Sequence, residues 1–217
     1  MSEAAVTPRS HAVAAEVEDM VNVVRTDGRN RRAAATRAKI IEAAKAMIEE
    51  TSEAPTVVGV ARRADVSVRS VFQHFGDVQS LFVTVVDSIG EGVTVNRPQL
   101  ANHPLGVRID ALIQAFVQVF DKIVPMRVAA GQFVGHPALL ERGLTLRQQL
   151  RDATVEIFAP ELSAMDTTAR EQLIDAIGAA LSLDAWIVLR RRDGLSVERA
   201  IGIWRLTLTA LLGTTKD

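Results

Sequence analysis

Apolar residues recur at helical intervals along almost the whole chain, and Gly, Pro and Asp residues mark the breaks between them. After residue 82 the pattern predicts a helix to about Ile89 and then a loop over 96–104. It predicts further helices from about residue 109 to near Pro125, over a short stretch before Gly135, and over 139–158, 168–192 and 196–212. The predicted fold class is therefore all-α.

Two short helices and a tight turn are predicted within residues 56–75, TVVGVARRADVSVRSVFQHF. Thr56 can accept backbone N–H groups as an N-cap, and Pro55 disfavours helix just before it. Asp65 tolerates the left-handed backbone of a tight turn, and Ser67 can cap a second helix that ends at Phe75. The segment is thus expected to form a helix, a turn and a second helix.

The second of these helices has an inward and an outward face. Val71 and Phe75 lie four residues apart and are expected to face inward. The outward set suits a DNA groove, because Arg can pair with guanine and Gln with adenine; it comprises Val68, Arg69, Ser70, Gln73 and His74. Helical spacing alone is explained equally well by a helical hairpin with a solvated charged face.

Residues 36–82 resemble the DNA-binding domain of the TetR family of bacterial transcriptional repressors, without a gap across three helices. The resemblance is carried by RAKIIEAAKAMIEE, by the 56–75 segment and by GDVQSLF. Family proteins show a Thr opening the second helix, an Ala-x-x-Ala-Gly-Val-Ser turn and an aromatic-x-His-Phe ending, which match Thr56, 61–67 and 72–75. The resemblance implies a three-helix domain with a helix-turn-helix over 33–82 and a helical ligand-binding and dimerisation domain over 83–217.

Several positions depart from the family pattern, among them the loop TSEAP before the second helix, where Glu53 replaces a buried ring. Phe72 stands where a Tyr hydroxyl usually donates to a phosphate, and Val78 stands where a Lys is common. Asp65 replaces the usual turn Gly. Since phosphate contacts mainly set orientation and salt-dependent affinity, these departures predict weaker binding or compensation from elsewhere, with specificity retained.

Residues 1–32 form an N-terminal extension. A stripe of Val and Met after Ser10 indicates a possible short helix, and a weakly structured Ala-rich tail is the alternative. Five arginines between residues 25 and 37 surround Asp27 and Gly28, which predicts a flexible basic arm for the minor groove or, equally, a solvated linker. The expected DNA-binding residues are then Arg31, Arg32, Arg37, Thr56, Ser67, Val68, Arg69, Ser70, Phe72, Gln73 and His74.

The resemblance also implies a pocket for a small apolar effector and a homodimer formed by the last two helices. Expected pocket residues are Phe116, Phe120, Met126, Phe133, Phe158 and Trp186, although core packing explains each of them as well. Expected dimer residues are Ala179, Leu183, Ile187, Ile201, Trp204 and Leu208, for which an internal core is the alternative. A dimer would match a palindromic operator.

Composition narrows the function classes. Residues 21–80 carry ten basic and seven acidic side chains, a net charge of +3, which favours a few placed DNA contacts over charge-driven coating of nucleic acid. The absence of cysteine excludes disulfides and thiolate chemistry. Neither a signal peptide nor an uninterrupted membrane-length apolar run is evident, so we expect a cytoplasmic protein without a membrane partner.

An enzyme is not expected. The four histidines are scattered without metal-ligand spacing, and neither a nucleophile elbow nor a carboxylate pair is evident, so we expect no catalytic residues, metal or cofactor. The expected function is sequence-specific transcriptional regulation, as a repressor released by an apolar ligand. The alternative is a TetR-like dimer that has lost DNA recognition and binds a protein partner.

Overall fold

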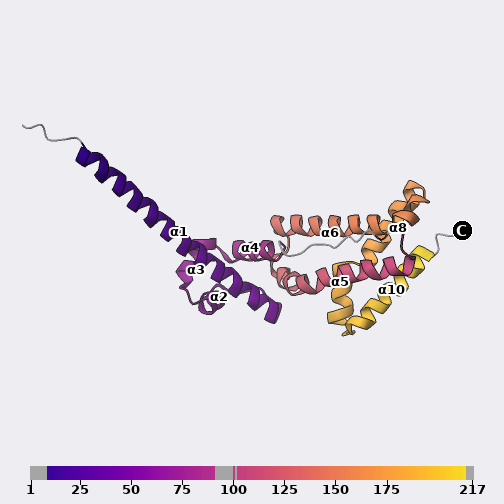
Figure 1. Ribbon diagram of the computed structural model, residues 1–217. Helices are drawn as coiled ribbons and strands as arrows, with labels where there is room; N and C mark the ends of the chain where they lie inside the picture. The colour runs from indigo at the N-terminus through magenta and orange to yellow at the C-terminus, as the bar shows by residue number, and fades with distance from the viewer. Residues whose placement is uncertain (1–8, 91–99, 101, 214–217) are drawn as a thin grey trace, which may run out of the picture.

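The computed structural model describes residues 9–90, 100 and 102–213, with side chains from Gly28 onward. Every regular element within these residues is a helix, so the prediction of an all-α fold is confirmed. The helices form two groups, which we call the head (α1 to α4) and the body (α5 to α10), and these lie at opposite ends of the molecule (Figure 1).

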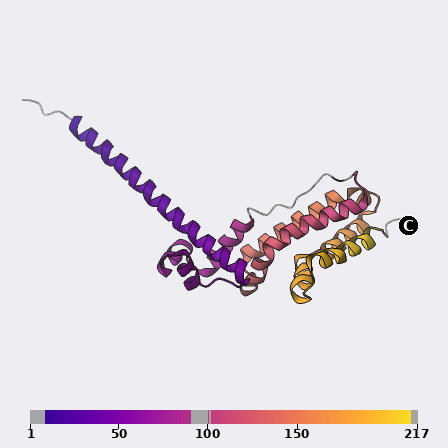
Figure 2. The ribbon, with the colours of Figure 1, turned by 60° about the horizontal axis from the view of Figure 1, so that its bottom comes forward.

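The head contains α1 (Arg9–Thr51), α2 (Val57–Ala64), α3 (Val68–Phe75) and α4 (Val78–Gly90). α1 packs against α2 and α4 with its C-terminal part, while its N-terminal part extends away from the molecule (Figures 1 and 2). A single apolar cluster holds the head together, and its most buried members are Ile40, Ala44, Ile48, Val60, Leu81, Phe82 and Val85.

The body is built around α5 (Leu105–Ala129), which contacts α6 (Pro137–Ile157), α9 (Leu183–Ile187) and α10 (Val197–Gly213). Figure 2 shows α5 and α6 side by side. The remaining elements are a 3₁₀ turn, η1 (Ala130–Phe133), α7 (Ala159–Ser163), α8 (Thr167–Ala180) and a π-helical turn, η2 (Val188–Arg192).

Aromatic rings fill the centre of the body. The ring centroids of Trp186 and Trp204 are 4.7 Å apart, and those of Phe120 and Trp204 are 6.0 Å apart. Phe116 continues the row, 5.8 Å from Phe120. The indole of Trp186 donates to Asp121 at 3.2 Å, which satisfies a polar group that burial would otherwise leave unpaired.

Two helix boundaries in the body differ from the predictions. The helix expected to stop near Pro125 continues to Ala129. The proline removes only one backbone hydrogen bond, and packing of the residues after it against the core offsets that loss. The helix expected over 168–192 is divided into α8, α9 and η2. Leu181 ends α8, and the Ser182 hydroxyl restarts the chain as an N-cap by accepting from the Ala185 amide at 3.1 Å.

The expected flexible arm is helical. α1 runs for 43 residues through the positions of Asp27, Gly28 and Asn30 without a break. One interior Gly costs about 1 kcal/mol of helix stability, and the many Ala and Arg residues of α1, which are strong helix formers, offset that cost. Arg32 also donates to the Gly28 carbonyl at 3.1 Å. The expected domain limits at 32 and 82 therefore fall inside α1 and α4.

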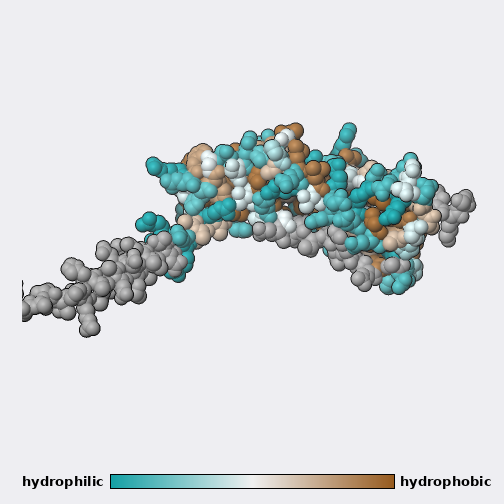
Figure 3. Space-filling view, turned by 90° about the horizontal axis from the view of Figure 1, so that it is seen from above, coloured by the Kyte–Doolittle hydropathy of each residue, from teal (hydrophilic) through white to brown (hydrophobic). Residues whose placement is uncertain are grey.

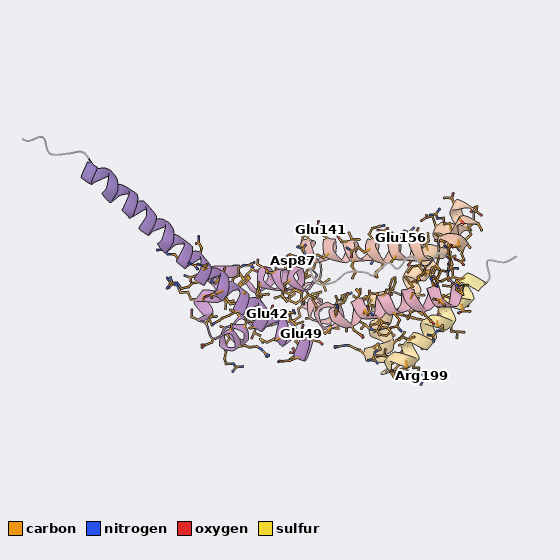
Figure 4. All side chains as sticks on the ribbon, viewed as in Figure 1. Glu42, Glu49, Asp87, Glu141, Glu156 and Arg199 are labelled. Carbon is orange, nitrogen blue, oxygen red and sulfur yellow. The ribbon has the colours of Figure 1, made fainter. Side chains whose placement is uncertain are left out.

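Head and body share side chains where they meet. Phe82 of α4 stacks on Phe133 of η1 with ring centroids 4.7 Å apart, and Ile89 and Met126 pack against both apolar clusters. Polar contacts also cross the junction. Arg142 of α6 pairs with Asp87 of α4, which is labelled in Figure 4, and Arg191 of η2 donates to the Ser52 hydroxyl at 2.7 Å. The two groups of helices are thus joined by packing as well as by the chain.

One segment, residues 167–192, is long and apolar enough by length and composition to cross a membrane, which is weak evidence for a span. This differs from the sequence-based expectation of no membrane-length apolar run. In the structure the segment consists of three consecutive helical pieces, and Leu173, Ile174, Ile177 and Trp186 are buried in the body core. These four residues are accounted for by core packing, and 28% of the apolar window as a whole is buried.

Asp65 offers a test of the α2–α3 turn, because its φ of +54° lies in the region that favours glycine. We expect Asp65→Gly to raise the free energy of unfolding by about 1 kcal/mol or less, since a Cβ in the left-handed region costs roughly 1–2 kcal/mol and Asp tolerates it better than most residues. Asp65→Ala, which also removes the carboxylate but keeps a Cβ, should lower it. Chemical denaturation measures both, and a glycine variant less stable than the alanine variant would contradict this account.

Candidate nucleic-acid interface

The turn between α2 and α3 is fixed by local hydrogen bonds. Thr56 Oγ1 accepts from the Gly59 amide at 3.1 Å, and Ser67 Oγ accepts from the Ser70 amide at 3.0 Å. Between the two caps, the Val66 amide donates to the Ala61 carbonyl at 3.0 Å. The predicted caps at Thr56 and Ser67 and the left-handed turn at Asp65 are confirmed.

Burial on α3 follows the predicted faces. Val71 and Phe75 are buried against the head core. Ser67, Val68, Arg69, Phe72 and Gln73 are exposed, whereas Ser70 and His74 are only half-exposed. Of the seven expected contact residues within 67–74, Ser70 and His74 are therefore less available to a macromolecule than the other five.

α1 brings a second set of expected residues to the same end of the head. Arg31, Arg32 and Arg37 are exposed, and the Arg37 guanidinium lies 5.0 Å from the ring centroid of Phe75, the last residue of α3. Residues 28–41 include five cations and no acidic side chain. The structure thus places one end of this basic stretch of α1, at Arg37, beside the C-terminal end of α3.

Other charges of the head are already engaged. Arg63 of α2 makes a two-pronged pair with Glu50, with N–O distances of 2.6 and 2.7 Å. The hydrogen bond from Arg63 lowers the pKa of the Glu50 carboxyl. Asp77 caps α4 by accepting from the Ser80 amide at 2.7 Å, and hydrogen bonds from Ser80 lower the pKa of Asp77. Both carboxylates are therefore anionic at neutral pH, and Arg63 is held by its partner.

The expected pocket residues do not gather in one place. Phe116, Phe120, Phe158 and Trp186 are buried in the body cluster. Phe133 instead packs on Phe82 in the head cluster, and Met126 lies between the two. The placement of Phe133 corrects the expectation that all six line one cavity. The residues adjacent to Phe133 in the sequence do not indicate whether it packs in the head cluster or in the body cluster.

The expected dimer residues are divided between the core and the surface. Trp204 and Leu208 are fully buried within one chain, which corrects their assignment to an interface. Leu183, Ile187 and Ile201 are half-buried, and only Ala179 is exposed. The alternative of an internal core holds for Trp204 and Leu208.

Exposed residues beyond the expected ones join Ala179 on the outward side of the last helices. Leu206 is 73% exposed and Ile203 37% exposed on α10, beside the exposed small residues Gly202 and Ala210. Gly178 and Ala179 are exposed on α8, which packs against α10. For the residues of α10, the sequence signal is the four-residue spacing of 202, 206 and 210. This spacing defines a helix face other than that of Trp204 and Leu208.

Apolar residues are also exposed on α6, where Leu140 and Leu144 lie one turn apart. Figure 3 views the molecule from the side of α6 and shows hydrophobic residues interrupting a mostly hydrophilic surface. Within the described part of the chain, His, Asp and Glu residues do not cluster in a way that could hold a metal ion.

Comparison with models of known protein families and with curated proteins gives no match for this chain. The interface therefore has to be interpreted from its own geometry and chemistry.

Proposed function

We propose that the protein is a sequence-specific DNA-binding transcriptional regulator that inserts α3 into the major groove. The observation that carries the proposal is the exposed pair Arg69 and Gln73, four residues apart on a short helix whose start is fixed by a cap and whose back is buried. These side chains can pair with guanine and adenine edges, and a rigid helix fixes where they reach.

Selection of DNA from a random pool by the full-length protein tests the proposal. An enriched sequence should emerge, and Arg69→Ala and Gln73→Ala should each weaken binding to it by roughly 1–3 kcal/mol. Arg147→Ala is the matched control, because Arg147 is exposed on α6 in the body, away from α3 (Figure 1). If no sequence is enriched, the exposed Phe72 and Val58 favour the alternative of a protein partner.

We further propose that the regulator is a homodimer joined through the outward sides of α8 and α10. Exposed Leu206 and Ile203 supply apolar contact, and exposed Gly178, Gly202 and Ala210 let two copies approach closely. Two-fold symmetry would present two copies of α3 to a palindromic operator with half-sites about 34 Å apart.

A small apolar effector that releases DNA completes the proposal. Its support is the TetR resemblance of residues 36–82 together with the packed junction, through which a change in the body would reach the head. A screen for apolar compounds that release the selected DNA tests it. A ligand that binds free and DNA-bound protein equally well cannot be that effector.

The basic stretch of α1 should contact phosphates outside the groove that α3 enters. A helix is about 10–12 Å wide and the minor groove only about 6 Å, so a helical extension cannot enter the minor groove as a flexible arm would. Arg29, Arg31 and Arg32 are exposed along about one helical turn. We infer that these cations contact the DNA backbone.

Replacing Arg29, Arg31 and Arg32 together by Gln should weaken binding to all DNA sequences alike. The slope of log affinity against log salt should shrink by about 0.9 for each phosphate that the protein no longer neutralises. Titrations at several salt concentrations measure it. Lys122, Arg147 and Arg192, exposed in the body outside α8 and α10, make the control triple. An unchanged slope would exclude the α1 arginines from DNA binding.

A further inference from the structure

The exposed side of α3 consists of two parallel ridges of different chemistry. Arg69 and Gln73 form a polar ridge, and Val68 and Phe72 form an apolar ridge, each pair four residues apart. Val68 is 39% exposed and Phe72 is 48% exposed. The apolar ridge is therefore part of the same surface that the proposed function turns toward DNA.

The chemistry of the apolar ridge restricts what it can contact. Neither side chain can donate a hydrogen bond to a phosphate or to a base edge. Among base-edge groups of the major groove, the apolar one is the C5-methyl of thymine, and contact with it removes apolar surface of both partners from water. A cytosine or a purine at the same place offers a polar edge that the ridge would leave without a partner.

We propose that Val68 and Phe72 read thymine methyl groups, so that each half-site carries thymines beside the bases contacted by Arg69 and Gln73. This inference rests on the proposed function and adds the base class that the site selects. The two Cα atoms are about 6 Å apart along the helix axis, which corresponds to about two base-pair steps of 3.4 Å. The two methyl groups should therefore lie within about two steps of each other.

Deoxyuridine provides a probe that removes the methyl and nothing else. In the selected DNA, thymines are replaced one at a time by deoxyuridine and the affinity of the full-length protein is measured. At two positions in each half-site, the replacement should weaken binding roughly fourfold, the value that corresponds to one buried methyl group. Deoxyuridine at other positions should leave the affinity unchanged.

Protein variants assign each methyl to its side chain. In Val68→Ala, deoxyuridine at one of the two sensitive positions should no longer matter, and in Phe72→Ala the other should become insensitive. Val188→Ala is the matched control, because Val188 is exposed to the same degree, 40%, on η2 in the body. Binding by Val188→Ala should remain sensitive to deoxyuridine at both positions. Circular dichroism and thermal melting verify that all three variants are folded.

The outcomes separate this inference from the function on which it rests. Failure to enrich any DNA would overturn the proposed function and this inference with it. Enriched DNA that tolerates deoxyuridine at every thymine would overturn the methyl readout while leaving DNA binding in place. Sensitivity that persists in both Val68→Ala and Phe72→Ala would assign the methyl contacts to other residues and overturn the role of the ridge.

Discussion

Glu161→Ala is expected to lower the free energy of unfolding by about 3–5 kcal/mol, because it leaves a buried guanidinium without its counter-ion. Arg108 is 4% exposed and pairs with Glu161 through both of its terminal nitrogens, one of them at 2.5 Å. It also donates to the carbonyls of Ile157 at 3.1 Å and His103 at 3.0 Å. These bonds tie the start of α5 to the end of α6 and to α7.

Urea denaturation at neutral pH measures this effect, and two further variants test its cause. Arg108→Met combined with Glu161→Leu should be less harmful than Glu161→Ala alone, because the buried charge is removed with its partner. Asp110→Asn breaks the exposed pair with Arg205, 2.6 Å apart, and should cost no more than about 1 kcal/mol. Equal costs for Glu161→Ala and Asp110→Asn would contradict the special role of the buried pair.

The same pair should contribute to acid sensitivity. The hydrogen bond from Arg108 lowers the pKa of the Glu161 carboxyl below its ordinary value of about 4.3. A carboxyl whose pKa is lowered by folding adds stability above its unfolded pKa. That stability is lost as the pH falls through the lower folded value. In Glu161→Gln, this part of the loss of stability below about pH 4.3 should be absent.

Leu206→Glu is expected to convert the proposed dimer to a monomer. It should weaken binding to a palindromic operator at least about a hundredfold, the lower end of the gain that joining two binding modules brings. Leu206 is the most exposed large apolar residue of α10, and in a two-fold dimer the new carboxylate would be buried twice. A monomer would also lack the second α3 that the palindrome matches. Sedimentation at micromolar concentration and a DNA titration measure the two effects.

Leu144→Glu is the matched control for Leu206→Glu, because Leu144 is 63% exposed on α6 instead of α10. It should leave both the mass and the operator affinity unchanged. A monomer produced by Leu144→Glu and not by Leu206→Glu would move the interface to α6.

The α2–α3 region could be predicted from the sequence because its determinants are local. A Thr or Ser hydroxyl caps the helix that follows it within three residues, and an Asp adopts the left-handed turn without help from distant residues. The inward face of α3 follows from the four-residue spacing of Val71 and Phe75. These observations need no knowledge of the rest of the fold.

The body could not be predicted to the same depth, because its apolar helices have more than one face that can be buried. Trp204 packs on Phe120 and Trp186 in the same chain, and Leu208 belongs to the same apolar cluster. The positions of α5 and α9 decide this, and the sequence of α10 alone does not show them. Likewise, nothing near Pro125 indicates that the helix continues past it. Gly28 favours a break when it is considered alone, yet the Ala-rich sequence after it favours helix strongly enough to continue α1.

The shared packing of head and body has a mechanical consequence. Ile89 and Met126 belong to both apolar clusters, and Phe133 of the body covers Phe82 of the head. Close-packed interiors transmit displacement because they contain little free volume to absorb it. A shift of η1 is therefore transmitted to α4 and to the position of α3. The head is rigidly coupled to the body and does not move independently of it.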